Sequence, residues 1–272
     1  MNIVKRLSCL FMPLPLATAA AAQEKSIRIG YAECVAATNY PASTIEKAAA
    51  AKWYFAHASV GANMIDGLMD LSKKDSKSWP YSTVLTDKVP PAETKPGTVY
   101  EHNRGNPGWQ AKFDLFASCV SNGWHYPKVN IAMNKLCYID QTASSRYYIR
   151  SMTNLEAVFP DTIFVYMTMP LTTATDSDNY LRNGFNDNVR QWTKENGRVL
   201  FDIADIEAHD SNGAPETFSK RNRTCQRLCD AYTTDGGHLN EAGRQLVARG
   251  FYALAAALQD KNYKAPALRV SK

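Results

Sequence analysis

The fold is decided by the stretch Trp53-Tyr54-Phe55-Ala56-His57-Ala58-Ser59-Val60-Gly61. Residues 53–58 are rich in aromatic and other apolar side chains, which favour a buried β-strand. A helical pattern follows over residues 62–73, so Ser59 stands at a strand-to-helix turn. A serine there lies at the rim of a sheet, and its own amide lies near a helix N-terminus that favours developing negative charge. Ser59 is therefore a candidate nucleophile, although a serine at this position is also an ordinary helix N-cap.

Outward from this stretch, apolar β-rich runs alternate with helical patterns. Strands are predicted at 53–58, 98–102, 129–133, 162–169 and 199–203. Helices are predicted at 62–73, 109–121, 144–158 and 179–196, with a last one from Glu241. This alternation indicates an α/β fold with a parallel sheet covered on both faces. Segments 74–97 and 208–233 have no periodicity and are predicted to be long loops that help to build a binding site.

The N-terminal segment is predicted to be a signal peptide over residues 1–22. Lys5 and Arg6 precede the apolar run 7–17, and small residues follow it. Residues 23–272 are then one exported domain, periplasmic or secreted. No later window is apolar enough to anchor it in a membrane. Removal of Lys5 and Arg6 lowers the formal charge from +5 to +3, and no basic cluster marks a nucleic-acid-binding groove.

Five cysteines remain after residue 22, an odd number for a chain expected in an oxidising compartment. At least one thiol is therefore expected to stay free or to pair between molecules. Cys225 and Cys229 lie four residues apart in a loop-like stretch and are predicted to form a local bridge. Burial as small core residues is expected for the others, which are Cys34, Cys119 and Cys137.

Two further stretches carry groups suited to acyl-transfer chemistry. Residues 103–109 read Asn-Arg-Gly-Asn-Pro-Gly-Trp, where the backbone N–H of Gly105 could donate to an oxyanion, although the stretch alone indicates only a turn. Asp235-Gly236-Gly237-His238 precedes the last helix. The aspartate can fold back onto one imidazole nitrogen and leave the other free to take a proton from a serine. A capped turn and a metal site are the alternatives, but no further metal ligands lie nearby at a known spacing.

In this order, the serine, the Asn-Arg-Gly-x-x-Gly turn and the Asp-x-x-His stretch resemble the sequence blocks of SGNH (GDSL-type) hydrolases. The resemblance spans nearly the whole chain after residue 22. It implies a flavodoxin-like, three-layer α/β/α fold with a five-stranded parallel sheet and no cofactor or metal. It also implies that Ser59 is the nucleophile and that Asp235 and His238 complete a catalytic triad. The backbone N–H groups of Ser59 and Gly105 would then belong to the oxyanion hole.

The chain departs from the family pattern in two places. His57-Ala58-Ser59 replaces the usual Gly-Asp-Ser, which resembles a divergent branch with a His-x-Ser-Val-Gly block. The Gly-x-Asn-Asp block expected after the third strand is replaced by residues 134–140, Asn-Lys-Leu-Cys-Tyr-Ile-Asp. The asparagine that would complete the oxyanion hole is therefore open between Asn106 and Asn134.

The resemblance and the signal peptide together imply an exported serine esterase. The resemblance implies acetylated carbohydrates or lipid esters as substrates, and because the chain after residue 22 offers no long apolar stretch for lipid, short acyl esters such as acetyl groups on carbohydrate are expected. A polysaccharide O-acyltransferase with the same triad and a non-catalytic carbohydrate-binding module are alternatives, and a cysteine-dependent enzyme that uses Cys137 ranks last. The substrate is expected to be a small acyl ester or an acylated carbohydrate, without a nucleic-acid partner. His57 is predicted to be a buried structural imidazole. Three aromatic side chains could line a sugar-sized cleft or belong to the core, namely Trp109, Trp124 and Tyr126.

Overall fold

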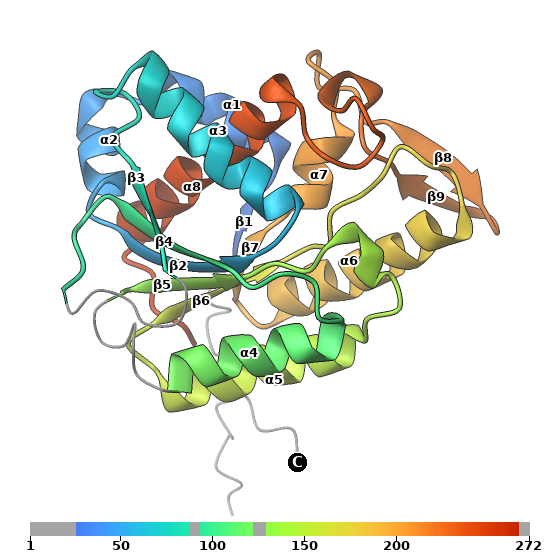
Figure 1. Cartoon of the computed structure of the whole chain (residues 1–272), viewed down its shortest axis with the longest axis horizontal. Coiled ribbons are helices and arrows are strands. Elements are labelled where there is room, and N and C mark those ends of the chain that lie inside the picture. The colour runs from blue at the N-terminus through green and yellow to red at the C-terminus, as the bar shows by residue number, and fades with distance from the viewer. Residues whose placement is uncertain (1–25, 87–92, 122–128, 267–272) are drawn as a thin grey trace, which may run out of the picture.

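A parallel seven-stranded sheet forms the centre of the part of the chain that the computed structural model describes, residues 26–86, 93–121 and 129–266 (Figure 1). The strand order is β1-β7-β6-β5-β2-β4-β3, and every pairing between neighbours is parallel. The strands are β1 (Ile27–Ile29), β2 (Lys52–His57), β3 (Ser82–Leu85), β4 (Thr98–Asn103), β5 (Ile131–Asn134), β6 (Ile163–Met167) and β7 (Val199–Phe201).

The five predicted strands correspond to β2, β4, β5, β6 and β7. Taken in chain order, they lie in the sheet as 2-1-3-4-5, which is the flavodoxin-like order. The prediction of a flavodoxin-like parallel sheet is therefore confirmed, but the predicted number of strands is wrong. The two further strands, β1 and β3, lie at the two edges and have only three and four residues. Runs this short show no readable periodicity, and β3 lies inside the segment predicted to be a loop.

Helices cover both faces of the sheet, so the three-layer prediction is confirmed (Figure 1). One face carries α1 (Tyr31–Ala36), α2 (Ala42–Ala48), α3 (Val60–Lys74) and α8 (Glu241–Asp260), and α7 (Ile203–Ala208) packs into the same apolar cluster. The other face carries α4 (Trp109–Ser121), α5 (Ser145–Val158) and α6 (Ser177–Glu195). The five long helices match the predicted ones to within two residues at their N-terminal ends. The three short helices, of six or seven residues, were not predicted.

The predicted loop 208–233 contains a small antiparallel hairpin of β8 (Thr217–Lys220) and β9 (Arg223–Gln226). Its two turn residues, Arg221 and Asn222, have φ values of 50° and 59°. Positive φ at both central residues is typical of the type I′ turn that fits the twist of a hairpin. In the sequence, Asn222 alone indicates this turn, because the preceding Arg221 is an unusual residue for it. Three single-turn 3₁₀ helices complete the described elements: Ala37–Asn39, Tyr138–Asp140 and Asp230–Tyr232.

The local bridge predicted between Cys225 and Cys229 is wrong, because both thiols are free, as are those of Cys34, Cys119 and Cys137. Cys225 belongs to β9, and the chain continues beyond it without a turn. An extended chain advances about 3.3 Å per residue, so cysteines four apart lie beyond the roughly 4.4–6.8 Å between Cα atoms that a disulfide spans.

None of the described helices is long and apolar enough to cross a membrane. The predicted signal peptide lies outside the described residues.

Helices α3 and α8 pack against each other with almost no space between their backbones. A Cβ atom added at Gly67 of α3 would lie well under 3.0 Å from the carbonyl oxygen of Arg244 in α8 and 2.9 Å from the Cβ atom of Ala248. The Arg244 guanidinium also pairs with Asp70 of α3, with 2.6 Å between Nε and Oδ2. Only glycine at position 67 therefore permits this approach of the two helices.

We expect Gly67→Ala to lower the free energy of unfolding by about 1–3 kcal/mol, the usual cost of overpacking, measured by urea denaturation. Gly184→Ala in α6 is the matched control, because its added Cβ would meet only the flexible end of Arg223, at 3.6 Å. Alanine has the better helix propensity by up to about 1 kcal/mol, so the control should be neutral or stabilising. Equal effects of the two substitutions would contradict this account of the α3–α8 contact.

Candidate active site

The predicted site residues lie where the carboxyl ends of the central strands meet. Ser59 follows β2, Gly105 and Asn106 follow β4, and Asn134 is the last residue of β5. The chain order along the sheet reverses between β2 and β5. In open α/β sheets, ligands bind in the crevice outside the carboxyl ends of the strands at such a switch point. The topology therefore brings these residues to the position where a ligand site is expected.

Ser59 has an unusual backbone conformation, with φ 55° and ψ −118°. A non-glycine residue in such a region costs about 1–3 kcal/mol, and residues of this kind cluster at functional sites. Ser59 is also the N-cap of α3, but its side chain makes no capping hydrogen bond. The ordinary N-cap role considered from the sequence is therefore not the role of its hydroxyl.

The hydroxyl of Ser59 contacts His238, with 2.7 Å between Oγ and Nε2. The other ring nitrogen of His238, Nδ1, lies 2.7 Å from Oδ2 of Asp235. Because the carboxylate accepts a hydrogen bond from the Nδ1–H group, Nε2 is left as the acceptor for the serine O–H. The structure thus brings the serine, histidine and aspartate into one hydrogen-bonded chain across 179 residues of sequence.

Asp235 is held by the turn that carries it. Its Oδ1 atom accepts the backbone N–H groups of Gly237, at 2.9 Å, and His238, at 2.8 Å. These two bonds, followed by the bond to the imidazole, hold the pKa of Asp235 well below its ordinary value. The side chains of Asp235 and His238 are 53% and 43% exposed, so the imidazole is both oriented by a carboxylate and accessible to a ligand.

Two residues that the sequence did not single out hold the histidine in place. Asn63, in the first turn of α3, accepts the backbone N–H of Leu239 through Oδ1 at 3.0 Å. Tyr138 packs its ring edge-on against His238, with 5.5 Å between the ring centres, and its hydroxyl lies 3.5 Å from Nε2. Burial and the nearby Asp235 raise the pKa of Tyr138, so this hydroxyl keeps its proton. Asn63 lies four residues after Ser59, on the same helical face, and this spacing is the feature of the sequence that could have identified it as a site residue.

The buried side chain of Arg104 holds the turn after β4 in place. Its guanidinium is buried and donates to the carbonyl oxygens of Gly105 (3.1 Å) and Lys135 and to Oδ1 of Asn134, with Nη2 at 3.1 Å from that atom. Gly105 has φ 69°, and no atom lies within 4 Å of the place where its Cβ would be. The space over Gly105 is thus open to a ligand, while its carbonyl is held inward.

The two candidate asparagines have different environments. Asn134 is 1% exposed, its Oδ1 is occupied by Arg104, and its Nδ2 is buried without a partner. Asn106 is exposed, and its Oδ1 accepts the thiol of Cys137 at 3.0 Å. The same thiol lies 3.5 Å from the carbonyl oxygen of Ala58, the residue before Ser59. Asn106 is therefore the asparagine that reaches the surface near Ser59, whereas Asn134 supports Arg104.

Cys137 itself is 1% exposed, and its thiol contacts the ammonium of Lys135 at 3.7 Å besides two oxygens. Among the described residues no imidazole contacts it. A cysteine nucleophile needs an accessible thiolate and an adjacent base. The burial of Cys137 leaves the first condition unmet.

His57 is fully buried, as predicted from the sequence, and its Nε2 lies 2.8 Å from Oε2 of Glu101 on the neighbouring strand β4. Desolvation lowers the pKa of His57 despite this carboxylate. Gly61 packs directly on it, because a Cβ at position 61 would lie within 3.0 Å of the side chains of His57 and Lys135. The His-x-Ser-Val-Gly block is thus a packing unit beneath Ser59.

Of the three aromatic residues considered for a sugar cleft, the structure describes Trp109, which packs against other aromatic side chains. Trp109 is partly buried and contacts Phe113 and Tyr147 edge-on, at 6.2 and 5.5 Å between ring centres. Trp124 and Tyr126 lie outside the described residues. No group of three or more described His, Cys, Asp or Glu side chains could hold a metal ion.

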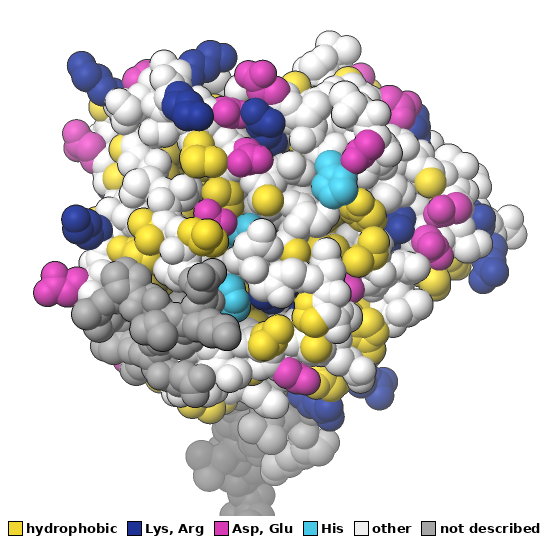
Figure 2. Space-filling view, in the orientation of Figure 1, with side chains coloured by type: hydrophobic (Ala, Val, Ile, Leu, Met, Phe, Trp, Pro, Cys, Tyr) yellow, Lys and Arg dark blue, Asp and Glu magenta, His cyan; other side chains and the backbone are white. Residues whose placement is uncertain are grey.

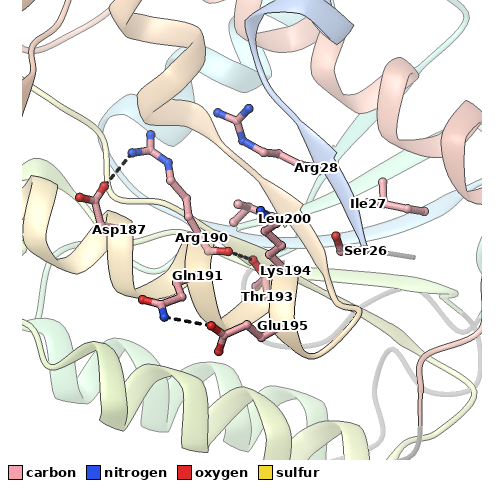
Figure 3. A pocket seen from close by; sticks show the side chains of 10 residues that line it. All are labelled: Ser26, Ile27, Arg28, Asp187, Arg190, Gln191, Thr193, Lys194, Glu195 and Leu200. Carbon is pink, nitrogen blue, oxygen red and sulfur yellow. Dashed lines mark hydrogen bonds and ion pairs between the residues drawn. The ribbon is translucent and has the colours of Figure 1, made fainter. Parts of the chain in front are cut away.

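A pocket of about 380 Å³ borders the triad on the side of Asp235, and its lining includes Tyr138 and Gly236. A larger pocket of about 640 Å³ lies between β1, β7 and the C-terminal half of α6 (Figure 3). None of the predicted site residues lines this larger pocket. Its arginines are already paired, Arg28 and Arg190 with Asp202 at 2.8 and 2.7 Å. The smaller pocket is the one that belongs to the candidate site.

Glu207 lies fully buried in α7, beneath the loop that forms one wall of the smaller pocket. Its Oε2 accepts the N–H of Leu171 at 2.9 Å, and its Oε1 has no partner. Burial raises the pKa of Glu207 from its ordinary 4.5 to about 8. Between these two pH values the folded protein holds a proton that the unfolded chain has lost. Stability is therefore lost as the pH rises through this range.

We expect Glu207→Gln to remove this pH dependence, because the amide keeps an acceptor for Leu171 but cannot ionise. The free energy of unfolding of the variant relative to the wild type should rise by about 1–4 kcal/mol between pH 5 and pH 8. Urea denaturation at the two pH values measures it. Glu46→Gln, at an exposed position of α2, is the control. A constant difference between the Glu207 variant and the wild type would show that the carboxyl is ionised throughout.

No protein-family model and no curated protein matches the sequence. Among solved structures, the chain is similar to a GDSL-like lipase from Bacteroides thetaiotaomicron, with 11% identity, a TM-score of 0.47, and 84% of this chain and 100% of that chain covered. It is also similar to a protein assigned as an acylhydrolase from Bacteroides fragilis (11% identity, TM-score 0.46, 77% and 86% covered). A third structure is a protein assigned as lipolytic, of the G-D-S-L family, from Desulfitobacterium hafniense (10% identity, TM-score 0.46, 75% and 99% covered). At these identities, what the chain does is inferred from its own site contacts.

Proposed function

We propose that the chain is an exported SGNH-type serine esterase that cleaves short acyl esters, such as acetyl esters of carbohydrate, through an acyl-enzyme. The observation that carries the proposal is the continuous chain of contacts from Ser59 Oγ through His238 to Asp235, with 2.7 Å at each of its two hydrogen bonds. The strained backbone of Ser59 at the switch point of the sheet supports the same role.

In the acylation step, Ser59 Oγ attacks the ester carbonyl carbon while its proton passes to His238 Nε2. The negative charge that develops on the carbonyl oxygen is stabilised by the backbone N–H groups of Ser59 and Gly105 and by the side-chain amide of Asn106. His238 then gives its proton to the alcohol oxygen as the carbon–oxygen bond breaks. Asp235 stabilises the imidazolium throughout, because its carboxylate stays ionised.

In the second step, a water molecule attacks the acyl-enzyme and loses its proton to His238, which returns a proton to Ser59 as the acid leaves. A sugar hydroxyl in place of the water would give transfer instead of hydrolysis through the same residues. The exposure of His238 supports access of either acceptor. Export is proposed from the predicted signal peptide alone.

Treatment of the purified protein with a fluorophosphonate probe at pH 7–8 should give a covalent adduct on Ser59, located by peptide mass spectrometry. His238→Ala should abolish the adduct, since Ser59 then has no base. His209→Ala is the matched control, because His209 contacts the carbonyl oxygen of Asp205 rather than Ser59. Absence of the adduct, or an adduct insensitive to His238, would favour the carbohydrate-binding module instead.

Asn106→Ala should lower kcat for an aryl acetate by about 100- to 1,000-fold, the usual effect of removing one oxyanion donor, and leave the free energy of unfolding nearly unchanged. Asn134→Ala should act differently, because it deprives the buried Arg104 of an acceptor and should lower the free energy of unfolding by about 1–3 kcal/mol. Steady-state kinetics and urea denaturation of both variants separate the two roles. The assignment fails if Asn106→Ala retains full kcat.

A further inference from the structure

The pocket of about 380 Å³ reaches the triad at Asp235, whereas Ser59 and His238 are not among its lining residues. Its inner wall includes Tyr138, whose hydroxyl lies 3.5 Å from His238 Nε2, and its lining includes Asp235 and Gly236. Gly105 and Asn106, the proposed oxyanion groups, do not line it. If Ser59 is the nucleophile, a group held in this pocket is thus placed near the proton of the imidazolium and not near the oxyanion.

The pocket lining is rich in hydrogen-bond acceptors, beside the hydroxyl groups of Tyr138, Thr172 and Thr173. Gln141 lines it with an Oε1 atom that is buried and has no partner, while its amide N–H donates to Asp178 Oδ2 at 3.1 Å. Asp176 also lines the pocket, with one carboxylate oxygen accepting the backbone N–H of Asn179. A ligand that satisfies these oxygens must supply several O–H or N–H donors.

Among the described residues that line the pocket, Arg182 is the one cationic side chain. Arg182 is buried, and its guanidinium donates to Tyr138 O at 2.6 Å, Thr172 Oγ1 at 3.0 Å and Asn179 Oδ1 at 3.1 Å. The lining otherwise contains three carboxylates, those of Asp176, Asp178 and Asp235, so its net charge is negative. A negatively charged ligand would therefore meet three carboxylates and a single guanidinium, which is buried and donates to neutral oxygens of the protein.

We propose that this pocket is the alcohol subsite of the esterase and that it takes an uncharged, hydroxyl-rich alcohol such as a pyranose ring, while it disfavours alcohols that carry a carboxylate. The proposal rests on the proposed function of the triad. The volume lies near the lower end of the roughly 300–1,000 Å³ of small-molecule pockets, which suits one sugar ring. Sugar hydroxyls donate to Gln141 Oε1 and the Asp178 carboxylate, and the ester oxygen then lies toward Tyr138 and His238.

The experiment compares three acetyl esters that share the acyl group and differ in the alcohol: 4-nitrophenyl acetate, an acetylated methyl glucopyranoside and the corresponding acetylated methyl glucuronopyranoside. We expect kcat/KM for the neutral sugar ester to exceed that for the anionic one by about tenfold or more at low salt. This ratio should shrink in 0.5 M NaCl, because salt screens the partly exposed carboxylates.

Asp178→Asn should reduce the preference for the neutral over the anionic sugar, because it removes one negative charge and keeps an oxygen acceptor. Gln141→Leu should lower the ratio of kcat/KM for the neutral sugar ester to that for the aryl ester by about tenfold, since the leucine offers no acceptor. Glu46→Gln is the control for loss of a carboxylate elsewhere. Fluorophosphonate labelling of Ser59 in every variant reports whether the triad is intact.

Two results would overturn the subsite but not the triad, provided that Ser59 labels normally. One is equal kcat/KM for the neutral and anionic sugar esters at low salt. The other is that neither Asp178→Asn nor Gln141→Leu changes its kcat/KM ratio. Failure of Ser59 to label in the wild type overturns the proposed function and the subsite with it.

Discussion

The contact between helices α3 and α8 is the constraint on which the site depends. Ser59 directly precedes α3, and the turn that carries His238 leads directly into α8, so the spacing of these helices sets the distance between the proposed nucleophile and its proposed base. Gly67 allows the helix backbones to touch, and Asn63 of α3 binds the backbone N–H of Leu239. The 2.7 Å contact between Ser59 and His238 is thus a consequence of helix packing, reinforced by one hydrogen bond a single turn into α3.

The strain at Ser59 is held by the packing beneath it. β2 lies between β4 and β5, and its residues from 53 to 57 are buried. Gly61 lies against His57 and Lys135, and Arg104 ties the ends of β4 and β5 together. A cost of about 1–3 kcal/mol for one strained residue is small against the burial of several large side chains at about 1.5–3 kcal/mol each. The backbone of Ser59 can therefore stay in a conformation that points its hydroxyl at His238.

The parts of the fold that the sequence predicts are those with a long, clear pattern. Strand β2 shows a continuous apolar run, helix α8 is long enough for its apolar residues to recur with a helical period, and the short spacing of Asp235 and His238 makes their contact local. The edge strands β1 and β3 are too short for such a pattern. The predicted bridge from Cys225 to Cys229 is wrong because Cys225 is extended, and this conformation depends on the pairing of its strand with β8. The sequence alone also does not distinguish the environments of Asn106 and Asn134. They differ because the Arg104 guanidinium binds the side chain of Asn134 in the interior.

The proposed oxyanion groups and the proposed alcohol subsite differ in electrostatic character. The oxyanion groups include the donors after β4, the backbone N–H of Gly105 and the amide of Asn106, which suit an oxygen that becomes negative. The alcohol subsite is the pocket lined by acceptors, among them Asp178 and Gln141, which suits an alcohol that brings its own donors. An ester has these two ends, a carbonyl oxygen and an alkoxy oxygen, and only one orientation gives each end groups of the right sign. The reversed orientation would place the developing oxyanion against carboxylates, so charge favours the orientation that the proposed mechanism requires.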